Sequence, residues 1–227
     1  MRGKSELKYE GAAAKQTSSG LNRDYITQWS YGIGETFSLL VPNVKGGASV
    51  PLSRSEKAME KANPMYSSLY SQLTQYFGDQ PMTSGPVYVG AFVLMLFILG
   101  CFIVKGPMKW ALLGATIFSI LLSWGKNFMG LTDFFIDYIP MYNKFRAVSS
   151  ILVIAEFTIP LLAILTLKEI LSKPELLKEN LKYIYISFGL TGGLALLFAI
   201  APRLFFPTYI PANEMAALQN ALPADQL

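Results

Sequence analysis

Residues 87–104 read VYVGAFVLMLFILGCFIV, an apolar run without a single charged residue. Similar runs follow at Met108–Trp124, Ile151–Leu167 and Tyr183–Ala201, and all four are 17 to 19 residues long. A helix of about 20 residues crosses the hydrocarbon layer of a bilayer, which is about 30 Å thick. A surface helix of a soluble protein would instead show a polar stripe. The sequence therefore predicts an all-α polytopic membrane protein with four transmembrane helices.

The composition agrees with this prediction, because the chain is 52% hydrophobic and 15% charged, whereas soluble domains are about 25% charged. The net charge of +4 comes without a Lys/Arg stripe, so we expect no nucleic-acid partner. The chain has no histidine and a single cysteine, Cys101, which excludes an internal disulfide and a His/Cys zinc site. We expect no organic cofactor, and a divalent metal held by carboxylates stays open.

Charges in the connections predict the orientation. The turn Lys105–Lys109 and the connection Lys168–Lys182 carry six lysines together, against four Lys/Arg in the connection 125–150 and the C-terminal tail. Positive loops favour the cytoplasm. We therefore expect a multi-pass membrane protein, with an extracytoplasmic segment 1–86 of mixed structure, a membrane region 87–201 and an extracytoplasmic tail 202–227.

The segment 1–86 is polar and offers no signal peptide, although the predicted orientation places it outside. A segment of this size does not usually cross a membrane without a signal or a preceding helix. We therefore expect the chain to be an internal portion of a longer polytopic protein.

Three stretches carry a family resemblance: DYITQWSYGIGETFSLLVPNVKGG from Asp24, FGDQPMTSGPVYVG from Phe77, and LSWGKNFMGLTDFFIDYIPMYNKFRAVSS from Leu122. Together they resemble the YfhO-type bacterial membrane proteins, especially their Bacteroidetes branch, over nearly the whole chain. The resemblance implies part of a GT-C glycosyltransferase-like fold, which uses a polyprenyl-phosphate sugar at the outer face of the membrane. It also implies an envelope glycopolymer or glycolipid as acceptor, and a catalytic base upstream of this chain.

The connection 125–150 holds the main candidate residues. Asp133 and Asp137 are four residues apart and share one face of an expected interfacial helix near 131–138. They are either its solvated face or a polar or metal site. Arg146 lies at the expected outer N-terminus of the third span, where free backbone N–H groups favour an anion. With Lys144 and Lys126 it forms either a set of headgroup anchors or a site for the phosphate of a lipid-linked donor.

Other candidates lie on both sides of this connection. Trp29, Tyr31, Glu35 and Asn43 are typical of loops that contact a sugar or acceptor, although aromatic residues are also common at membrane interfaces. Glu156 is an acid inside the third span, four residues before Pro160, where we expect a kink. It is either a proton relay or substrate contact, or a neutral carboxyl bonded to a neighbouring helix. We expect Gly189, Gly192 and Gly193 to form a close helix-packing face.

Two classes of function remain. One is a membrane glycosyltransferase fragment, whose partners are membrane lipids, a polyprenyl-phosphate sugar and an envelope glycan acceptor. The other is a non-catalytic membrane protein, such as a lipid-linked-sugar transporter or an envelope assembly subunit. Broken helices in paired repeats would favour transport, and a carboxylate in an upstream external loop would favour the enzyme.

Overall fold

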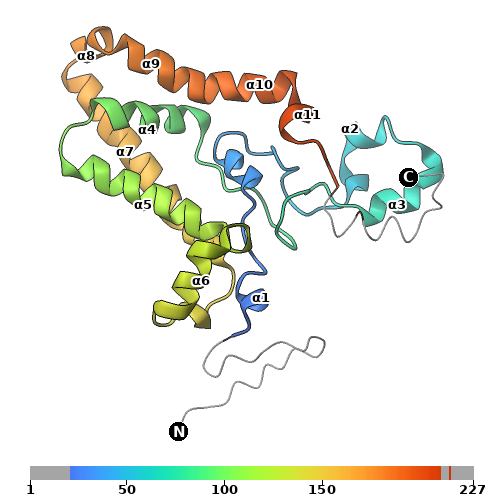
Figure 1. Ribbon diagram of the computed structural model, residues 1–227. Coiled ribbons are helices and arrows are strands. Elements are labelled where there is room, and N and C mark those ends of the chain that lie inside the picture. Colours follow the sequence, from blue (N-terminus) through green and yellow to red (C-terminus); the bar gives the residue numbers. More distant parts are fainter. Residues whose placement is uncertain (1–20, 211–214, 216–227) are drawn as a thin grey trace.

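The computed structural model describes residues 21–210 and Met215, whose regular secondary structure is helical (Figure 1). The first twenty residues of the predicted external segment, and most of the predicted tail after residue 210, lie outside the described part. No strand occurs in the described residues, whose only bridge joins Pro51 to Thr74. The α-helices of the loop regions are α1 (Arg23–Ile26), α2 (Glu56–Met59), α3 (Ser67–Gln72), α6 (Met129–Tyr138), α8 (Glu175–Glu179) and α11 (Pro202–Phe205).

The described part of segment 1–86, which was predicted to be of mixed structure, holds helical turns and loops but no strand. Its 3-10 turns are η1 (Gly34–Leu39), η2 (Leu52–Arg54) and η3 (Pro64–Tyr66). Pro42, Pro51, Pro81 and Pro86 interrupt the segment. Proline has no N–H to donate to a strand ladder, so these positions limit the length of any strand.

The apolar runs form the long helices, which are α4 (Ala91–Ile103), α5 (Pro107–Ser123), α7 (Val153–Ser172) and the pair α9 (Leu181–Phe188) and α10 (Leu194–Ile200). Two continuous helices, Val148–Ser172 and Leu181–Ile200, are long and apolar enough to cross a membrane. The first adds the 3-10 turn η6 (Val148–Leu152) to α7, and the second contains the π-turn η7 (Gly189–Gly193). A third span is reached only by combining α5 with the helix that follows it.

The first apolar run is the clearest departure from the predicted spans. The expected helix over Val87–Val104 begins only at Ala91, after Gly90 with φ of +100°, and has 13 residues. At 1.5 Å per residue it is about 20 Å long, which is less than the hydrocarbon thickness. Val87 is held outside the helix, because its carbonyl accepts a hydrogen bond from the Ser38 hydroxyl. An apolar run thus gives the position of a helix but overestimates its length.

A sharp bend follows the second apolar run. Helix α5 ends at Ser123, and the segment of η4 (Gly125–Phe128) and α6 makes an angle of 108° with it. Gly125 at the bend has φ of +44°, and an added Cβ would come within 2.1 Å of the Ser30 Oγ. A helix thus forms where the interfacial helix near 131–138 was predicted. Its position at a membrane surface stays a prediction.

Helix α7 packs against both α4 and α5. A Cβ added to Gly100 would lie 2.1 Å from the Thr166 Oγ1, so α4 and α7 approach closely at this glycine. The hydroxyls of Thr116 and Thr158 join α5 to α7 at 2.6 Å. Small residues and hydroxyl pairs are typical of contacts between helices in membranes.

The glycines predicted to form a packing face in the last run do not do so in the structure. A Cβ added to Gly189 or Gly193 would meet open space, and one added to Gly192 would meet only Phe188 of the same helix. These residues instead make the π-turn η7. The helix α7 also continues through Pro160 from Val153 to Ser172.

Figure 1 shows how the connections are distributed. The turn between α4 and α5 and the connection through α8 lie at one end of the long helices, on the left of the view. The N-terminal segment, the bend with α6, and α11 lie away from that end. The two lysine-rich connections of the sequence thus share one end of the bundle, as the predicted topology requires.

Candidate functional site

A buried carboxylate organises the N-terminal segment where it meets the long helices. Glu35 in η1 is 3% exposed and accepts hydrogen bonds from the Tyr76 hydroxyl and from the N–H of Gly32 (2.6 Å) and Asp79 (3.2 Å). The side-chain amide of Gln80 donates a fourth at 3.4 Å. A buried carboxylate is costly unless it is hydrogen-bonded, so these four donors are what make its burial tolerable.

Tyr31 connects the same region to the long helices. Its hydroxyl shares a hydrogen bond with Ser38, and its N–H donates to the carbonyl of Ser123 at the end of α5. Burial raises the pKa of Tyr31 to about 12, although the Ser38 hydrogen bond opposes this shift. Burial, followed by the nearby Glu35, raises the pKa of Tyr76 as well. Both phenols are therefore neutral near pH 7.

The bend after α5 supplies the solvent-facing side of this region. Asn127 donates from its amide to the Asp79 carboxylate (3.0 Å) and to the carbonyl of Tyr31 (3.0 Å). The ammonium of Lys126 donates to the carbonyl of Asp79 at 3.1 Å, and both of these side chains are exposed. We call the set the Glu35 cluster; its members are Tyr31, Glu35, Tyr76, Asp79, Gln80, Lys126 and Asn127.

Arg146 lies just before the span Val148–Ser172, as predicted, and is exposed. Its guanidinium donates to the Tyr25 hydroxyl at 2.7 Å and lies 5.6 Å from the centre of the Tyr25 ring. The N–H of Ser149, in the first turn of the span, already donates to the carbonyl of Trp29. One backbone group expected to favour an anion there thus has a partner within the protein.

The three predicted phosphate ligands have different surroundings. Lys126 contacts Asp79, whereas Arg146 contacts Tyr25, and Lys144 is exposed in η5 (Tyr142–Lys144). The cation that shares a site with carboxylates is Lys126. Among the predicted phosphate ligands it is thus the one the structure ties to the Glu35 cluster.

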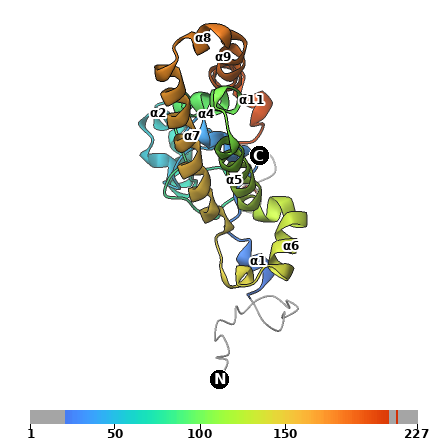
Figure 2. The ribbon, with the colours of Figure 1, turned by 90° about the vertical axis from the view of Figure 1, so that its left-hand side faces the viewer.

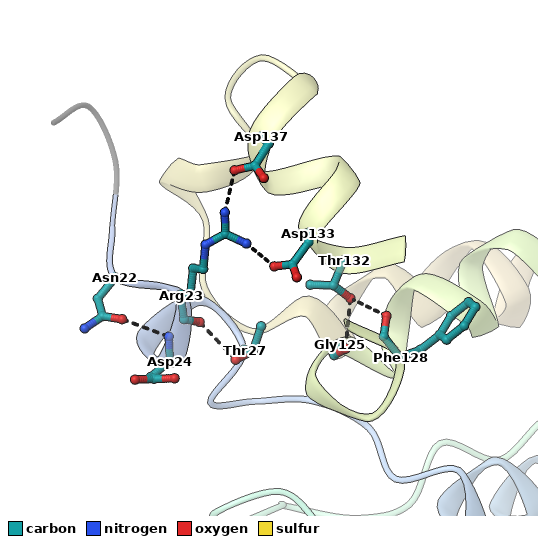
Figure 3. A network of polar contacts seen from close by, with 9 residues as sticks. All are labelled: Asn22, Arg23, Asp24, Thr27, Gly125, Phe128, Thr132, Asp133 and Asp137. Atoms are coloured by element: carbon teal, nitrogen blue, oxygen red, sulfur yellow. Dashed lines mark hydrogen bonds and ion pairs between the residues drawn. The ribbon is translucent and has the colours of Figure 1, made fainter. Parts of the chain in front are cut away.

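The two aspartates of α6 do share a face, as predicted, and both bind one arginine. The Arg23 guanidinium donates to Asp133 and, at 2.6 Å, to Asp137 (Figure 3). These hydrogen bonds raise the pKa of Arg23, with the Asp137 bond as the largest cause. In both ribbon views α1 and α6 lie side by side, away from the long helices (Figure 2). No group of three or more metal-ligating residues of the His, Cys, Asp or Glu type occurs in residues 21–210.

The residues predicted to contact a sugar differ in how deeply they are buried. Tyr31 and Glu35 are buried, Trp29 is half-buried, and Asn43 is exposed. A carbohydrate could reach Asn43 but not the carboxylate of Glu35, whose hydrogen bonds are made within the protein. Glu35 therefore positions its neighbours rather than offering a free surface.

Glu156 lies on an exposed face of α7, beside Val153 and Phe157, which are 62% and 68% exposed. The predicted bond to a neighbouring helix is not seen among the described residues. The carboxyl instead lies on an apolar helix face that no other described element covers.

A hollow lies at the end of α10. It is a cavity of about 320 Å³ between the N-terminal segment and the last helices, and its lining residues are Val41, Asn43, Val44, Phe77, Ala195, Phe198, Ala199, Pro202, Phe206 and Tyr209. The ammonium of Lys45 lies 5.1 Å from the ring centres of both Phe77 and Phe206. We call it the aromatic cavity.

The comparisons with known proteins leave the family open, since no family model, no curated protein and no solved structure matches this chain.

Four of these residues were not predicted from the sequence: Lys45, Tyr76, Asp79 and Gln80. Tyr76 lies just before the quoted stretch beginning FGDQP, which contains Asp79 and Gln80, and that stretch was the one available signal. Lys45 is a single cation in an otherwise apolar stretch, VPNVKGG, and nothing local in the sequence indicates the rings that surround it.

Proposed function

We propose that this chain is part of a membrane glycosyltransferase that transfers a sugar from a polyprenyl-phosphate donor to a glycan acceptor of the bacterial envelope. The Glu35 cluster would lie on the extracytoplasmic side of the inner membrane, and the two lysine-rich connections on the cytoplasmic side. The chain would belong with the YfhO-type proteins and hold part of a GT-C-like fold with four membrane-associated helices.

One observation carries this proposal. At the end of α5, the ammonium of the exposed Lys126 donates to the backbone carbonyl of Asp79, whose N–H donates in turn to the buried Glu35. A lipid-linked donor presents its phosphate at such a helix end, where a lysine can meet it. Arg146, before the next span, supplies a second cation with the planar geometry that suits phosphate oxygens.

The test is glycosyl transfer from a polyprenyl-phosphate sugar by the full-length protein that contains this chain, purified and placed in nanodiscs. Lys126→Ala should lose one charge-assisted interaction of about 1.5–3 kcal/mol, which is roughly a ten- to hundredfold loss of donor affinity. Arg146→Ala should have an effect of the same order, and Arg146→Lys should restore only part of it. Lys178→Ala, in α8 at the other end of the bundle, is the matched control and should leave transfer unchanged.

The same assay tests the polar pair of α6. Because Asp133 and Asp137 already bind Arg23, Asp133→Asn and Asp137→Asn should leave transfer nearly unchanged. Transfer that is equal in wild type, Lys126→Ala and Arg146→Ala would remove both cations from the site. No transfer with any donor would reject the enzyme.

A non-catalytic role in moving a lipid-linked sugar is the second candidate, favoured by two irregular helices. The α5–α6 pair is bent by 108°, and the π-turn η7 lies within the last span. Discontinuous helices are typical of transporters, and π-turns are frequent at functional sites. A fluorescent lipid-linked sugar in proteoliposomes distinguishes the two, because a transporter moves it between leaflets without cleaving the sugar from the phosphate.

A further inference from the structure

The aromatic cavity lies at the end of a span. Ala195, Phe198 and Ala199 belong to the last two turns of α10, which ends at Ile200, and Pro202 and Phe206 follow at once. Residues at the end of a membrane-spanning helix lie near the lipid headgroups, where aromatic side chains are enriched. The cavity thus lies where the phosphate of a lipid and the first part of its chain would both be within reach.

The walls of the cavity are apolar and well ordered by ring contacts. Phe198 packs edge to face against Phe37 and Phe206, with ring centres 5.1 and 5.3 Å apart. Its volume of about 320 Å³ is at the lower end of the range for small-molecule sites, about 300–1,000 Å³. A hydrocarbon chain fits such walls better than a polar solute does.

The surface around the cavity favours a lipid over a soluble ligand. Ile200, Leu204 and Tyr209 are 72%, 82% and 47% exposed, although all three are apolar or amphipathic. An exposed apolar rim of this kind is unfavourable in water and suits contact with a membrane. The ligand would therefore enter from the bilayer.

Lys45 is not among the lining residues of the cavity, but it lies against two of them, Phe77 and Phe206, and supplies the charge. Its ammonium is half-buried between Phe77 and Phe206, and no carboxylate of the described residues lies within 4 Å of it. Burial lowers the pKa of Lys45, while the more distant Asp79 and Glu35 oppose that shift. These two carboxylates do not line the cavity, and their hydrogen bonds are made inside the Glu35 cluster. Arg203 lies exposed on α11 at the same end.

We propose that the aromatic cavity binds an anionic membrane phospholipid, whose phosphate is held by Lys45 and whose upper chain lies among Phe198, Phe206 and Tyr209. A phosphate would give the half-buried ammonium the anion that no carboxylate of residues 21–210 supplies within 4 Å, and the exposed rim would be covered by the rest of the lipid. Lys45 also lines a small pocket beside Tyr31, Glu35 and Tyr76, so this site adjoins the Glu35 cluster, but it does not depend on the proposed transfer reaction.

The experiment uses the protein in phosphatidylcholine nanodiscs doped with one of two photoreactive lipids. Both carry a diazirine in the upper chain; one has a phosphatidylglycerol headgroup and the other a phosphatidylcholine headgroup. After irradiation, mass spectrometry locates the labelled residues. We expect Phe198, Phe206 or Tyr209 to be labelled several-fold more by the anionic lipid.

Two kinds of variant test the charge of Lys45 and the free volume of the aromatic cavity separately. Lys45→Gln should lower labelling by the anionic lipid about tenfold, because one charge-assisted hydrogen bond is lost, and Lys45→Arg should retain it. Ala199→Trp keeps the charge but fills the cavity, so it should also abolish labelling. Lys57→Gln in α2 is the matched control, since it removes an exposed lysine of the same segment, whereas Lys45 lies over the rings of Phe77 and Phe206.

Equal labelling by the two headgroups in wild type would overturn the proposal, because it would mean an unselective lipid contact. Labelling unchanged in Lys45→Gln would overturn it as well. If Lys45→Gln did not fold, the headgroup comparison in wild type and the Ala199→Trp variant would still decide. Inorganic phosphate should not compete, and competition by it would indicate a soluble anion instead.

Discussion

The buried carboxylate of Glu35 accepts a hydrogen bond from the hydroxyl of Tyr76, 41 positions further along the chain. This bond joins the 3-10 turn η1 to the loop that carries Asp79 and Gln80. The exposed part of the Glu35 cluster therefore depends on a contact that is itself inaccessible to solvent.

Removing that hydroxyl should be costly. Tyr76→Phe leaves Glu35 with one donor fewer in a buried position, so the free energy of unfolding should fall by about 1–3 kcal/mol. Thermal unfolding in detergent measures this. Tyr70→Phe, which removes an accessible hydroxyl in the same segment, should change stability by less than about 0.5 kcal/mol. Equal effects of the two substitutions would mean that the Glu35–Tyr76 hydrogen bond adds no more to the free energy of unfolding than the exposed Tyr70 hydroxyl does.

The pKa of Tyr31 predicts a loss of stability in alkaline solution. Its pKa is about 12 in the folded protein, against about 10 for an unfolded chain. Between these values the unfolded chain loses the proton while the folded protein keeps it, so stability falls as pH rises, by at most about 3 kcal/mol. The raised pKa of Tyr76 acts in the same direction. Melting temperatures across this pH range should fall less steeply for Tyr31→Phe than for wild type, and parallel slopes would contradict the assignment.

The close approach of α4 and α7 at Gly100 can be tested with two equivalent substitutions. Gly100→Ala places a methyl group against Thr166 and Leu162, and should cost about 1–3 kcal/mol by overpacking. Gly114→Ala in α5 meets open space, so it should be neutral or stabilise by up to about 1 kcal/mol. The difference between the two melting temperatures is the measurement. Gly100→Ala as stable as Gly114→Ala would mean that α4 and α7 lie further apart.

The sequence predicted the positions of the long helices well, because uninterrupted apolar runs have few other structures available. The ends of these helices were not predicted correctly. The start of α4 depends on Gly90 and on the bond from Ser38 to Val87, and the bend at Gly125 depends on contact with Ser30. Each of these is a contact between residues far apart in the chain.

The candidate site was predicted only in part, for the same reason. The shared face of Asp133 and Asp137 follows from helical spacing, but their partner Arg23 lies more than a hundred residues earlier. Lys126 was singled out for its charge, whereas its neighbour Asp79 could not be identified from local pattern. Local periodicity predicts individual helices, whereas the site is formed by contacts between residues of different helices and loops.

The central claim is that the Glu35 cluster and the two lysine-rich connections lie on opposite sides of a membrane. Ser38 is buried and bonded to Tyr31, so a cysteine there would be shielded from reagents. Ser68 and Ser172 are both exposed and suit the experiment.

The decisive measurement is labelling of single cysteines at Ser68 and Ser172, in a Cys101→Ala background, by a membrane-impermeant maleimide applied to intact cells. The account predicts that Ser68→Cys is labelled at once, and that Ser172→Cys is labelled only after the membrane is permeabilised. The reverse pattern, or immediate labelling of both, would contradict it.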